Sequence, residues 1–504
     1  MKLAGLAFIS VVVAAPAHAA TCESLATLTR PNTTILSAST QTAGSFVQPG
    51  APGGRGGGAN PLFARLPSFC RVTASLTPTA DSDIRIEVWL PTSGWNGKLQ
   101  SVGNGAWAGT IGYAALGNAL AGGYATAATD TGHVGNTAKF VPGHSEKMID
   151  YGYRAVHEMT LAVKAIVSAF YGDGPRLSYW NGCSTGGRQG LMEALRYPAD
   201  YDGIIAGAPV NDRTHQLTWE LWVAQAVHRD EARYIPPTKY PAIHQAALNA
   251  CDARDGLKDD LIDDPRSCRF DPAVLECKNG DAASCLTRPQ VEAARRIYSP
   301  AVNPKTKQQI FPALQPGSEL GWGGLAGPQP VGEAVEFFQY VVFNDPTWDY
   351  RTLEFDTAAD AADKAAAGVL NVTDPNLKPF FDRGGKLLLY HGWNDQLVAP
   401  VNSVNYYTRV TSMLDPGKAA SSIRLFMMPG VNHCQGGSGP DTFDRMKVIE
   451  DWVERGQTPS RIDASHATAG TIDRTRPLCA YPQVARHTGS GSTDDAANFV
   501  CRMP

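Results

Sequence analysis

The sequence predicts an α/β fold with a mostly parallel β-sheet that is interrupted by a large insert. Short apolar segments typical of buried strands alternate with segments whose apolar residues have helical spacing. One of these strands runs directly into a glycine-rich turn and a helix, and the alternation stops between residues 211 and 378 before it resumes. With 504 residues, of which 43% are hydrophobic, the chain can bury more than one core.

The first 19 residues have the pattern of a secretory signal peptide. Lys2 precedes an apolar run over residues 3–16, and A-H-A at residues 17–19 is typical of a cleavage site. The alternative, a membrane anchor, is disfavoured because the run is too short to span a bilayer. No later stretch is long and apolar enough either, so we expect an exported protein, periplasmic or secreted, without a membrane partner.

The charge of the chain excludes one class of partner. A formal net charge of -4 and a pI near 6.3 provide no basic surface for nucleic acid, and no Lys/Arg cluster suggests a membrane surface. The 50 glycines and 35 prolines predict many loops, and residues 50–58 are expected to form a flexible, exposed one.

Four strands and one helix are expected before the glycine-rich turn. The first two strands alternate apolar and polar residues, which is typical of half-buried antiparallel strands. The helix has apolar residues at helical spacing. The expected strands cover residues 69–76, 83–90, 98–102 and 124–128, and the helix covers residues 150–170.

The glycine-rich turn is the strongest local pattern. A strand over residues 177–180 enters G-x-S-x-G at residues 182–186, and a helix follows from residue 190. Strand, sharp turn and helix are the context of a nucleophile elbow, in which Ser184 would stand exposed at the end of the strand. The alternative interpretation is a tight turn with a buried serine.

The remaining elements frame the insert. Residues 211–378 hold four cysteines, many prolines and many aromatic residues, and we interpret them as an inserted lid subdomain. Residues 20–210 and 379–504 would then form one catalytic domain. Outside the insert, further strands are expected at residues 202–209, 385–391 and 423–428, with helices at residues 401–414 and 443–455.

Two residues after the insert complete the pattern of an α/β-hydrolase, in which an acid and a histidine follow the serine, each just past a strand. Asp395 and His433 occupy such positions. A serine needs an imidazole to take its proton, and the imidazole needs a carboxylate to orient it. The alternatives are an Asx turn for Asp395, a loop histidine for His433, and His391 as a competing base.

The cysteines strengthen this interpretation. Their even number in an exported chain predicts five disulfides, and the absence of any C-x-x-C pair disfavours a zinc site. Cys183 directly precedes Ser184 and Cys434 directly follows His433, so a bond between them would hold nucleophile and base together. The expected pairs are Cys22–Cys70, Cys183–Cys434, Cys251–Cys268, Cys277–Cys285 and Cys479–Cys501.

Together, G-C-S-T-G-G-R-Q-G at residues 182–190, the Asp395 loop and the His433-Cys434 pair resemble the tannase/feruloyl esterase family. The family includes feruloyl esterases, tannases and the mono(2-hydroxyethyl) terephthalate hydrolase group. The resemblance covers nearly the whole mature chain and implies an α/β-hydrolase core with a large lid, which agrees with the insert. An oxyanion hole requires two N–H donors, and we expect Thr185 and Gly105, with Ala106 standing where the family often has glycine.

The resemblance also implies a structural Ca²⁺ in the lid. Residues 251–265 gather acidic side chains between two cysteines, and calcium prefers oxygen ligands from tightly turning loops. The alternative is a solvated acidic turn, and Asp260 stands where the family commonly has glycine. The implied ligands are the side chains of Asp252, Asp255 and Asp259 and the carbonyls of Leu257 and Leu261.

The expected function is that of an exported serine carboxylesterase that needs no cofactor for catalysis. By resemblance its substrate is a small aromatic ester or an ester-decorated plant polymer: a feruloyl ester first, a galloyl ester or a terephthalate half-ester next. Two other classes compete with this expectation. A non-catalytic exported binding protein on the same fold would be favoured by a lost triad residue, and all three residues are present. A metalloenzyme that uses the acidic loop fails, because that loop offers no histidine and lies in the insert.

Overall fold

The computed structural model describes residues 20–49 and 60–504. The predicted signal peptide and the whole of the predicted loop at residues 50–58 lie outside these residues. None of the described helices is long and apolar enough to span a membrane.

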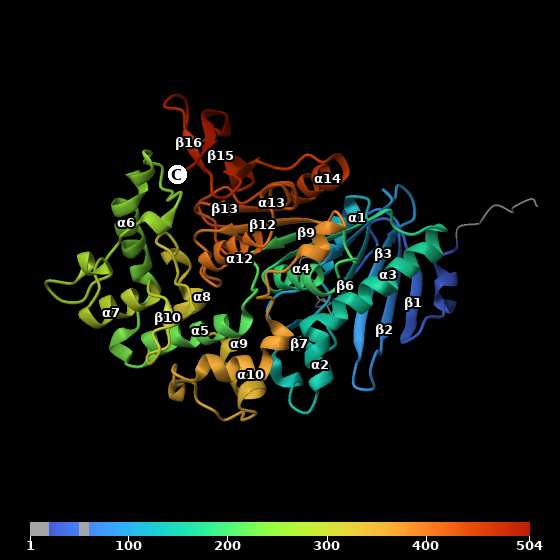
Figure 1. Ribbon diagram of the computed structural model, residues 1–504, viewed down its shortest axis with the longest axis horizontal. Helices are drawn as coiled ribbons and strands as arrows, with labels where there is room; N and C mark the ends of the chain where they lie inside the picture. The colour runs from blue at the N-terminus through green and yellow to red at the C-terminus, as the bar shows by residue number, and fades with distance from the viewer. Residues whose placement is uncertain (1–19, 50–59) are drawn as a thin grey trace, which may run out of the picture.

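A nine-stranded sheet forms the centre of the described chain (Figure 1). Its first three strand pairs are antiparallel, and every pair from β6 onward is parallel. In spatial order the strands are β1 (Thr33–Gln41), β2 (Phe69–Leu76), β3 (Ile84–Pro91), β6 (Ala125–Thr129), β4 (Lys98–Val102), β8 (Leu177–Cys183), β9 (Gly203–Gly207), β12 (Lys386–Gly392) and β13 (Ile423–Met428).

The alternation in β2 and β3 predicts half-buried strands, and this prediction is wrong. Most residues of both strands are buried, including Glu87 on β3. The polar positions are tolerated in the interior because they pair with one another: Glu87 accepts hydrogen bonds from Arg71, from Trp89 at 2.8 Å and from Tyr113 at 2.8 Å.

Helices cover both faces of the sheet and make a three-layered core. One face packs against α3 (Ala155–Tyr171), α4 (Thr185–Arg196) and α12 (Val401–Ser412). The opposite face packs against α1 (Tyr113–Ala121) and α14 (Arg445–Arg455). Because both faces are covered, the parallel strands β9, β12 and β13 consist of mainly apolar runs rather than alternating ones.

The segment between β9 and β12, drawn green to orange in Figure 1, forms mainly helices around two apolar clusters. The second cluster also contains Trp107, Ala138, Met148 and Tyr151 from the chain before β8. Most of its tryptophans are core residues, since Trp219, Trp222 and Trp322 are buried. The division of the chain at residues 211 and 378 remains a prediction. The helices are α5 (Arg213–His228), α6 (Tyr240–Cys251), α7 (Arg288–Ile297), α8 (Gly323–Ala326), α9 (Gly332–Glu336), α10 (Ala358–Leu370) and α11 (Lys378–Asp382), with a small hairpin of β10 (Ala301–Val302) and β11 (Gln309–Phe311).

The other short elements connect the layers or follow the sheet. Two antiparallel hairpins lie beyond α14, near the C-terminus (Figure 1). These elements are α2 (Ser145–Ile149), α13 (Pro416–Ser422), β5 (Ala108–Gly109), β7 (Gly135–Asn136), β14 (Arg461–Thr468), β15 (Thr471–Cys479), β16 (Val484–His487) and β17 (Phe499–Arg502).

Candidate active site

Ser184 occupies a sharp turn between the end of β8 and the start of α4. Its backbone is left-handed, with φ 62° and ψ -122°, a conformation that is strained for a residue with a side chain. Its side chain makes no capping hydrogen bond to α4, and its N–H donates to Gly207 O at 2.9 Å. This geometry is that of a nucleophile elbow.

The turn is tight because glycines meet without side chains between them. A Cβ on Gly103 would lie 2.5 Å from Cα of Gly186, which is closer than real contacts allow. The loop after β4 therefore lies directly against the first turn of α4.

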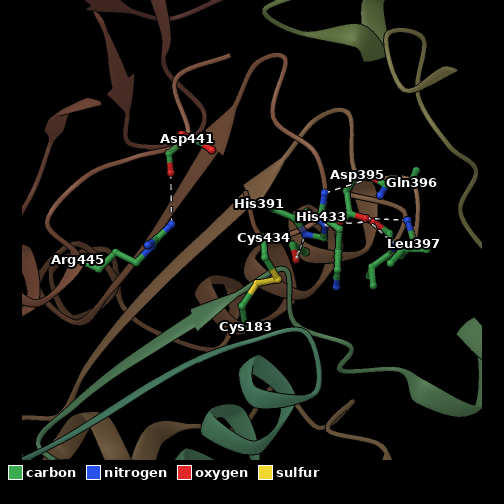
Figure 2. Close-up of a disulfide and its surroundings, with 11 residues drawn as sticks. Cys183, His391, Asp395, Gln396, Leu397, His433, Cys434, Asp441 and Arg445 are labelled. Carbon is green, nitrogen blue, oxygen red and sulfur yellow. Dashed lines mark hydrogen bonds and ion pairs between the residues drawn. A yellow bond between two sulfur atoms is a disulfide. The ribbon is translucent and has the colours of Figure 1, made fainter. Parts of the chain in front are cut away.

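The disulfide between Cys183 and Cys434 joins this turn to the loop after β13, with 6.0 Å between the two Cα atoms (Figure 2). It brings together segments 251 positions apart in the sequence. The remaining cysteines also pair as the sequence predicts, and no described cysteine is free.

Asp395 and His433 lie side by side beside this disulfide (Figure 2). Nδ1 of His433 is 2.7 Å from Oδ2 of Asp395, and the Asp395 side chain is fully buried. The other carboxylate oxygen accepts the N–H groups of Leu397 and Val398, both at 2.8 Å. Asp395 is therefore fixed in place while it orients the ring of His433.

Electrostatics bind the same pair together. Burial opposes the charge on Asp395, but the charge of His433 and the hydrogen bonds from His391 and His433 outweigh it and hold the Asp395 pKa well below its usual range. Burial likewise opposes the charge on His433, and Asp395 outweighs it, so the pKa of His433 is raised. An imidazolium at His433 is thus stabilised by the carboxylate.

The structure brings Ser184 and His433 to the same place through their disulfide-bonded neighbours, but not into direct contact. Among the hydrogen bonds of the described residues, none joins Ser184 Oγ to His433 Nε2. Hydrogen bonds of this kind are often long without substrate and tighten once it binds.

His391 has a supporting place rather than that of a base. It is fully buried; its Nδ1 lies 2.7 Å from Oγ of Ser403, and its Nε2 lies 2.9 Å from Oδ2 of Asp395 and 3.1 Å from the carbonyl of Val398. Both ring nitrogens are thus occupied. The sequence offered His391 only as a competing base, and its position at the end of β12 was the one available signal.

The expected oxyanion donors lie at the junction of the same turn. Thr185 is the first residue of α4, and its hydroxyl donates to the carbonyl of Ala106 at 3.0 Å. In the described chain, the N–H groups of Thr185, Gly105 and Ala106 donate to no protein acceptor. Ala106 has φ 48°, the left-handed conformation that favours glycine.

A polar chain from the insert reaches the acid loop and has no signal in the sequence. The side chain of Gln216 on α5 donates to Leu397 O at 3.1 Å, and Arg213 donates to Gln216 Oε1 at 2.7 Å. Arg213 also pairs with Glu333, whose carbonyl accepts from Trp107 in the loop after β4 at 3.3 Å. Helix α5 is thereby tied to both loops that border Ser184.

The acidic loop of the insert lacks enough positive charge for its buried carboxylates. Oδ1 of Asp259 is buried without a hydrogen-bond partner, while its Oδ2 contacts Arg476. Burial raises the pKa values of Asp252 and Asp255, and that of Asp263 to about 7, which Arg476 offsets only in part. Such a set fits a cation.

The loop is not closed around an ion site, however. Among the described residues, Asp252, Asp255 and Asp259 do not bring their oxygens within 4.8 Å of one another. Instead Asp252 accepts the N–H groups of Asp259 and Asp260, both at 3.1 Å. Asp260 has φ 64°, again a backbone conformation that favours glycine.

Comparisons with known proteins agree with this geometry. The model of the family described as tannase and feruloyl esterase matches residues 70–502. The chain belongs to this family. It is 38% identical over 548 aligned positions to an uncharacterized esterase from Xanthomonas campestris pv. campestris, with 98% of this chain and 93% of the relative covered. It is 33% identical to feruloyl esterase B from Aspergillus niger, with 86% of each chain covered.

Solved structures show the same fold. The crystal structure of feruloyl esterase B from Aspergillus oryzae superposes with a TM-score of 0.89 at 30% identity, covering 95% of this chain and 99% of that one. Tannin acyl hydrolase from Aspergillus niger superposes with a TM-score of 0.78 at 24% identity, covering 94% and 92%. The protein thus has an α/β-hydrolase fold and is a carboxylic ester hydrolase.

Proposed function

We propose that the protein is a serine esterase that works through an acyl-enzyme. Ser184 attacks the ester carbonyl, His433 takes its proton and returns it to the leaving alcohol, and Asp395 orients His433. Water then attacks the acyl-enzyme by the reverse route. The observation that carries this proposal is the buried Asp395–His433 pair, which Cys183–Cys434 holds beside the strained turn of Ser184.

Two backbone donors would stabilise the tetrahedral intermediate. The N–H of Thr185 and that of Gly105 have no protein acceptor, and the loop after β4 lies directly against the start of α4. An oxyanion between them would be held by groups that need no rearrangement during the reaction. The unoccupied N–H of Ala106 is the alternative second donor.

The substrate we propose is an ester of an aromatic acid, with a feruloyl ester first. Feruloyl esterase B from Aspergillus niger and from Aspergillus oryzae supports this choice by its similarity over most of the chain. Galloyl esters are the first alternative, supported by the tannase part of the family's description, and terephthalate half-esters are the second. The substrate would be small or attached to a plant polymer.

We also propose a structural Ca²⁺ in the acidic loop. The unpartnered oxygen of Asp259 and the raised pKa values of Asp252 and Asp255 support it. The carbonyls of Leu257 and Leu261 would complete the ligands. A bound cation would neutralise the loop and stabilise the insert, with no part in ester cleavage. Export is proposed as well, since five disulfides suit an oxidising compartment.

The test is hydrolysis of methyl ferulate, methyl gallate and mono(2-hydroxyethyl) terephthalate by the oxidised protein, with Ser184→Ala as control. We expect turnover of at least one ester, highest for methyl ferulate, and a loss of about 10³-fold or more in the variant. Labelling of Ser184 by a fluorophosphonate without turnover would contradict the aromatic substrate but keep the mechanism. Neither labelling nor turnover would contradict both.

A further inference from the structure

A cationic groove of about 720 Å³ lies on the insert, between the C-terminal end of α5 and helix α7. Its volume is that of a pocket for a small organic ligand. We call it the arginine groove, and the residues that define it are Trp222, Arg229, Arg233, Glu292, Arg296 and Phe355.

Two of its three arginines have no counter-ion in the described chain. Arg233 pairs with Glu292 at 2.9 Å, whereas the guanidinium groups of Arg229 and Arg296 make no hydrogen bond or ion pair with described residues. Asp230, which also lines the groove, caps the next helical turn through the N–H of Ala232 at 3.1 Å. The groove is therefore positive on a protein whose formal net charge is -4.

One of the two arginines without a counter-ion, Arg296, is held in place by an aromatic ring. Cζ of Arg296 lies 3.3 Å from the ring centroid of Trp222, and Trp222 packs edge-on against Phe355 with 5.0 Å between centroids. Burial and the neighbouring charge of Arg233 lower the pKa of Arg296, as expected for a cation that lacks an anion. A stacked guanidinium keeps its N–H edge free for a planar carboxylate.

We propose that the arginine groove binds a carboxylate attached to a ring, at a site separate from the active site. Arg229 and Arg296 would hold the carboxylate, and the ring would pack near Phe355. Helix α5 places Arg213 beside the candidate active site and reaches Arg229 sixteen residues later, about 24 Å along its axis. A ligand in the groove therefore does not occupy the position of the ester.

Two sources could supply this chemistry. One is an aromatic acid such as ferulate, which rests on the proposed function because that reaction would release it. The other is a uronate unit of an acidic polysaccharide, which would hold the enzyme on a polymer that carries esters. The arginine groove has the same residues and charge whichever ester the active site cleaves.

The experiment is calorimetric titration of the full protein at low salt with ferulate and, separately, with oligogalacturonate. Neutral xylo-oligosaccharide is the ligand control. The variants are Arg229→Ala and Arg296→Gln, singly and together, and each is checked by its melting temperature. Arg295→Ala is the matched control, since Arg295 lies on the same helix but pairs bidentately with Asp271 away from the groove.

We expect at least one of the two anions to bind, with a loss of about 10-fold or more in the double variant and less than about 2-fold in Arg295→Ala. If oligogalacturonate binds, the ligand of the arginine groove is the acidic polysaccharide. If ferulate binds and the double variant loses this binding, the ligand is the aromatic acid. No anion binding, or an equal loss in Arg295→Ala, would overturn the proposal. Methyl ferulate turnover, measured in parallel, should be unchanged in the double variant and reports on the proposed function separately.

Discussion

Asp395 and the carboxylates of the acidic loop have pKa values that are shifted in opposite directions. Asp395 receives two imidazoles and two backbone N–H groups, and its pKa lies well below the usual range. In the acidic loop of the insert, the pKa values of Asp252 and Asp255 are raised, and one oxygen of Asp259 has no partner. The protein's own groups compensate the charge of Asp395, whereas they compensate the charges of the acidic loop only in part.

This difference separates positioning from binding. A carboxylate with all its hydrogen bonds made cannot move, which suits a residue that orients a histidine. Carboxylates that lie close together inside a folded loop repel one another, and a bound cation would relieve this repulsion. Perturbed pKa values of opposite direction thus point to different roles.

The largest expected effect comes from removing the charge of Asp395, whose two carboxylate oxygens both accept hydrogen bonds. Asp395→Asn should lower kcat by about 10³–10⁴-fold, because the amide no longer stabilises the imidazolium or fixes its tautomer. Steady-state kinetics with the best ester measure this loss. Asp441→Asn is the control and should lose far less, because Asp441 accepts the N–H of Gly436 on the loop of His433 but makes no hydrogen bond to Asp395 or His433 among the described residues. Equal losses would contradict the special role of Asp395.

Removal and addition of Ca²⁺ test the acidic loop, the second member of the comparison. Because a cation that binds only the folded loop stabilises it, EDTA should lower the melting temperature by about 5 °C, and added Ca²⁺ should restore it. Asp259→Asn should melt at the lower temperature and no longer respond to either. Methyl ferulate turnover below the melting range should be unaffected. A wild-type melting temperature indifferent to EDTA and Ca²⁺ would favour the solvated acidic turn.

The contribution of His391 to holding Asp395 in place can be measured separately from the contribution of His433. His391→Leu removes a hydrogen bond to buried Asp395 and should lower kcat by about 10-fold, while His391→Gln, which can still donate, should recover part of it. A merely structural defect would lower both variants alike. KM should change little in either variant, because no described contact of His391 is with the oxyanion loop.

The pH profile follows from the raised pKa of His433. The base must be neutral to accept the proton, so kcat/KM should rise with pH through a midpoint above the ordinary value of 6.5. His391→Leu leaves Asp395 charged and should keep this midpoint raised. In Asp395→Asn the midpoint of the residual activity should fall, because the charge that raises it is gone. An unchanged midpoint there would contradict the assignment of His433 as base.

Much of the site could be predicted because its signals are local. Ser184 stands in a short pattern with a strand before it and a helix after it, and the cysteines beside Ser184 and His433 mark two distant segments as neighbours. The parallel strands β9, β12 and β13 could be predicted for the same reason, since each contains a run of mainly apolar residues.

The rest depends on contacts that no spacing encodes. Gln216 meets Leu397, and Arg213 meets Glu333, across long stretches of the insert. The burial of β2 and β3 was missed because Glu87 looks like a surface residue until its three donors are assembled around it. An alternating sequence shows which residues are polar. It does not show which residues are exposed, because polar groups can be buried when they pair with one another inside the core.

The smallest expected effect concerns Glu193 on α4, a buried carboxylate that lies beside His157 and Asp200. Among the described residues neither of its oxygens has a hydrogen-bond partner, and burial, together with the charge of Asp200, raises its pKa well above the ordinary value. The folded protein therefore keeps this proton at a pH where the unfolded chain releases it. The stability that this protonation contributes is present below the unfolded pKa and is lost as pH rises.

Glu193→Gln should remove that dependence, because an amide of the same shape stays neutral at every pH. Near pH 5 its melting temperature should match the wild type, and near pH 8 it should lie about 2 °C higher. Glu158→Gln on neighbouring α3 is the matched control and should show no such divergence. If Glu193→Gln instead melts lower at pH 8, the charge on Glu193 is satisfied in the folded state, and this carboxylate belongs with Asp395 rather than apart from it.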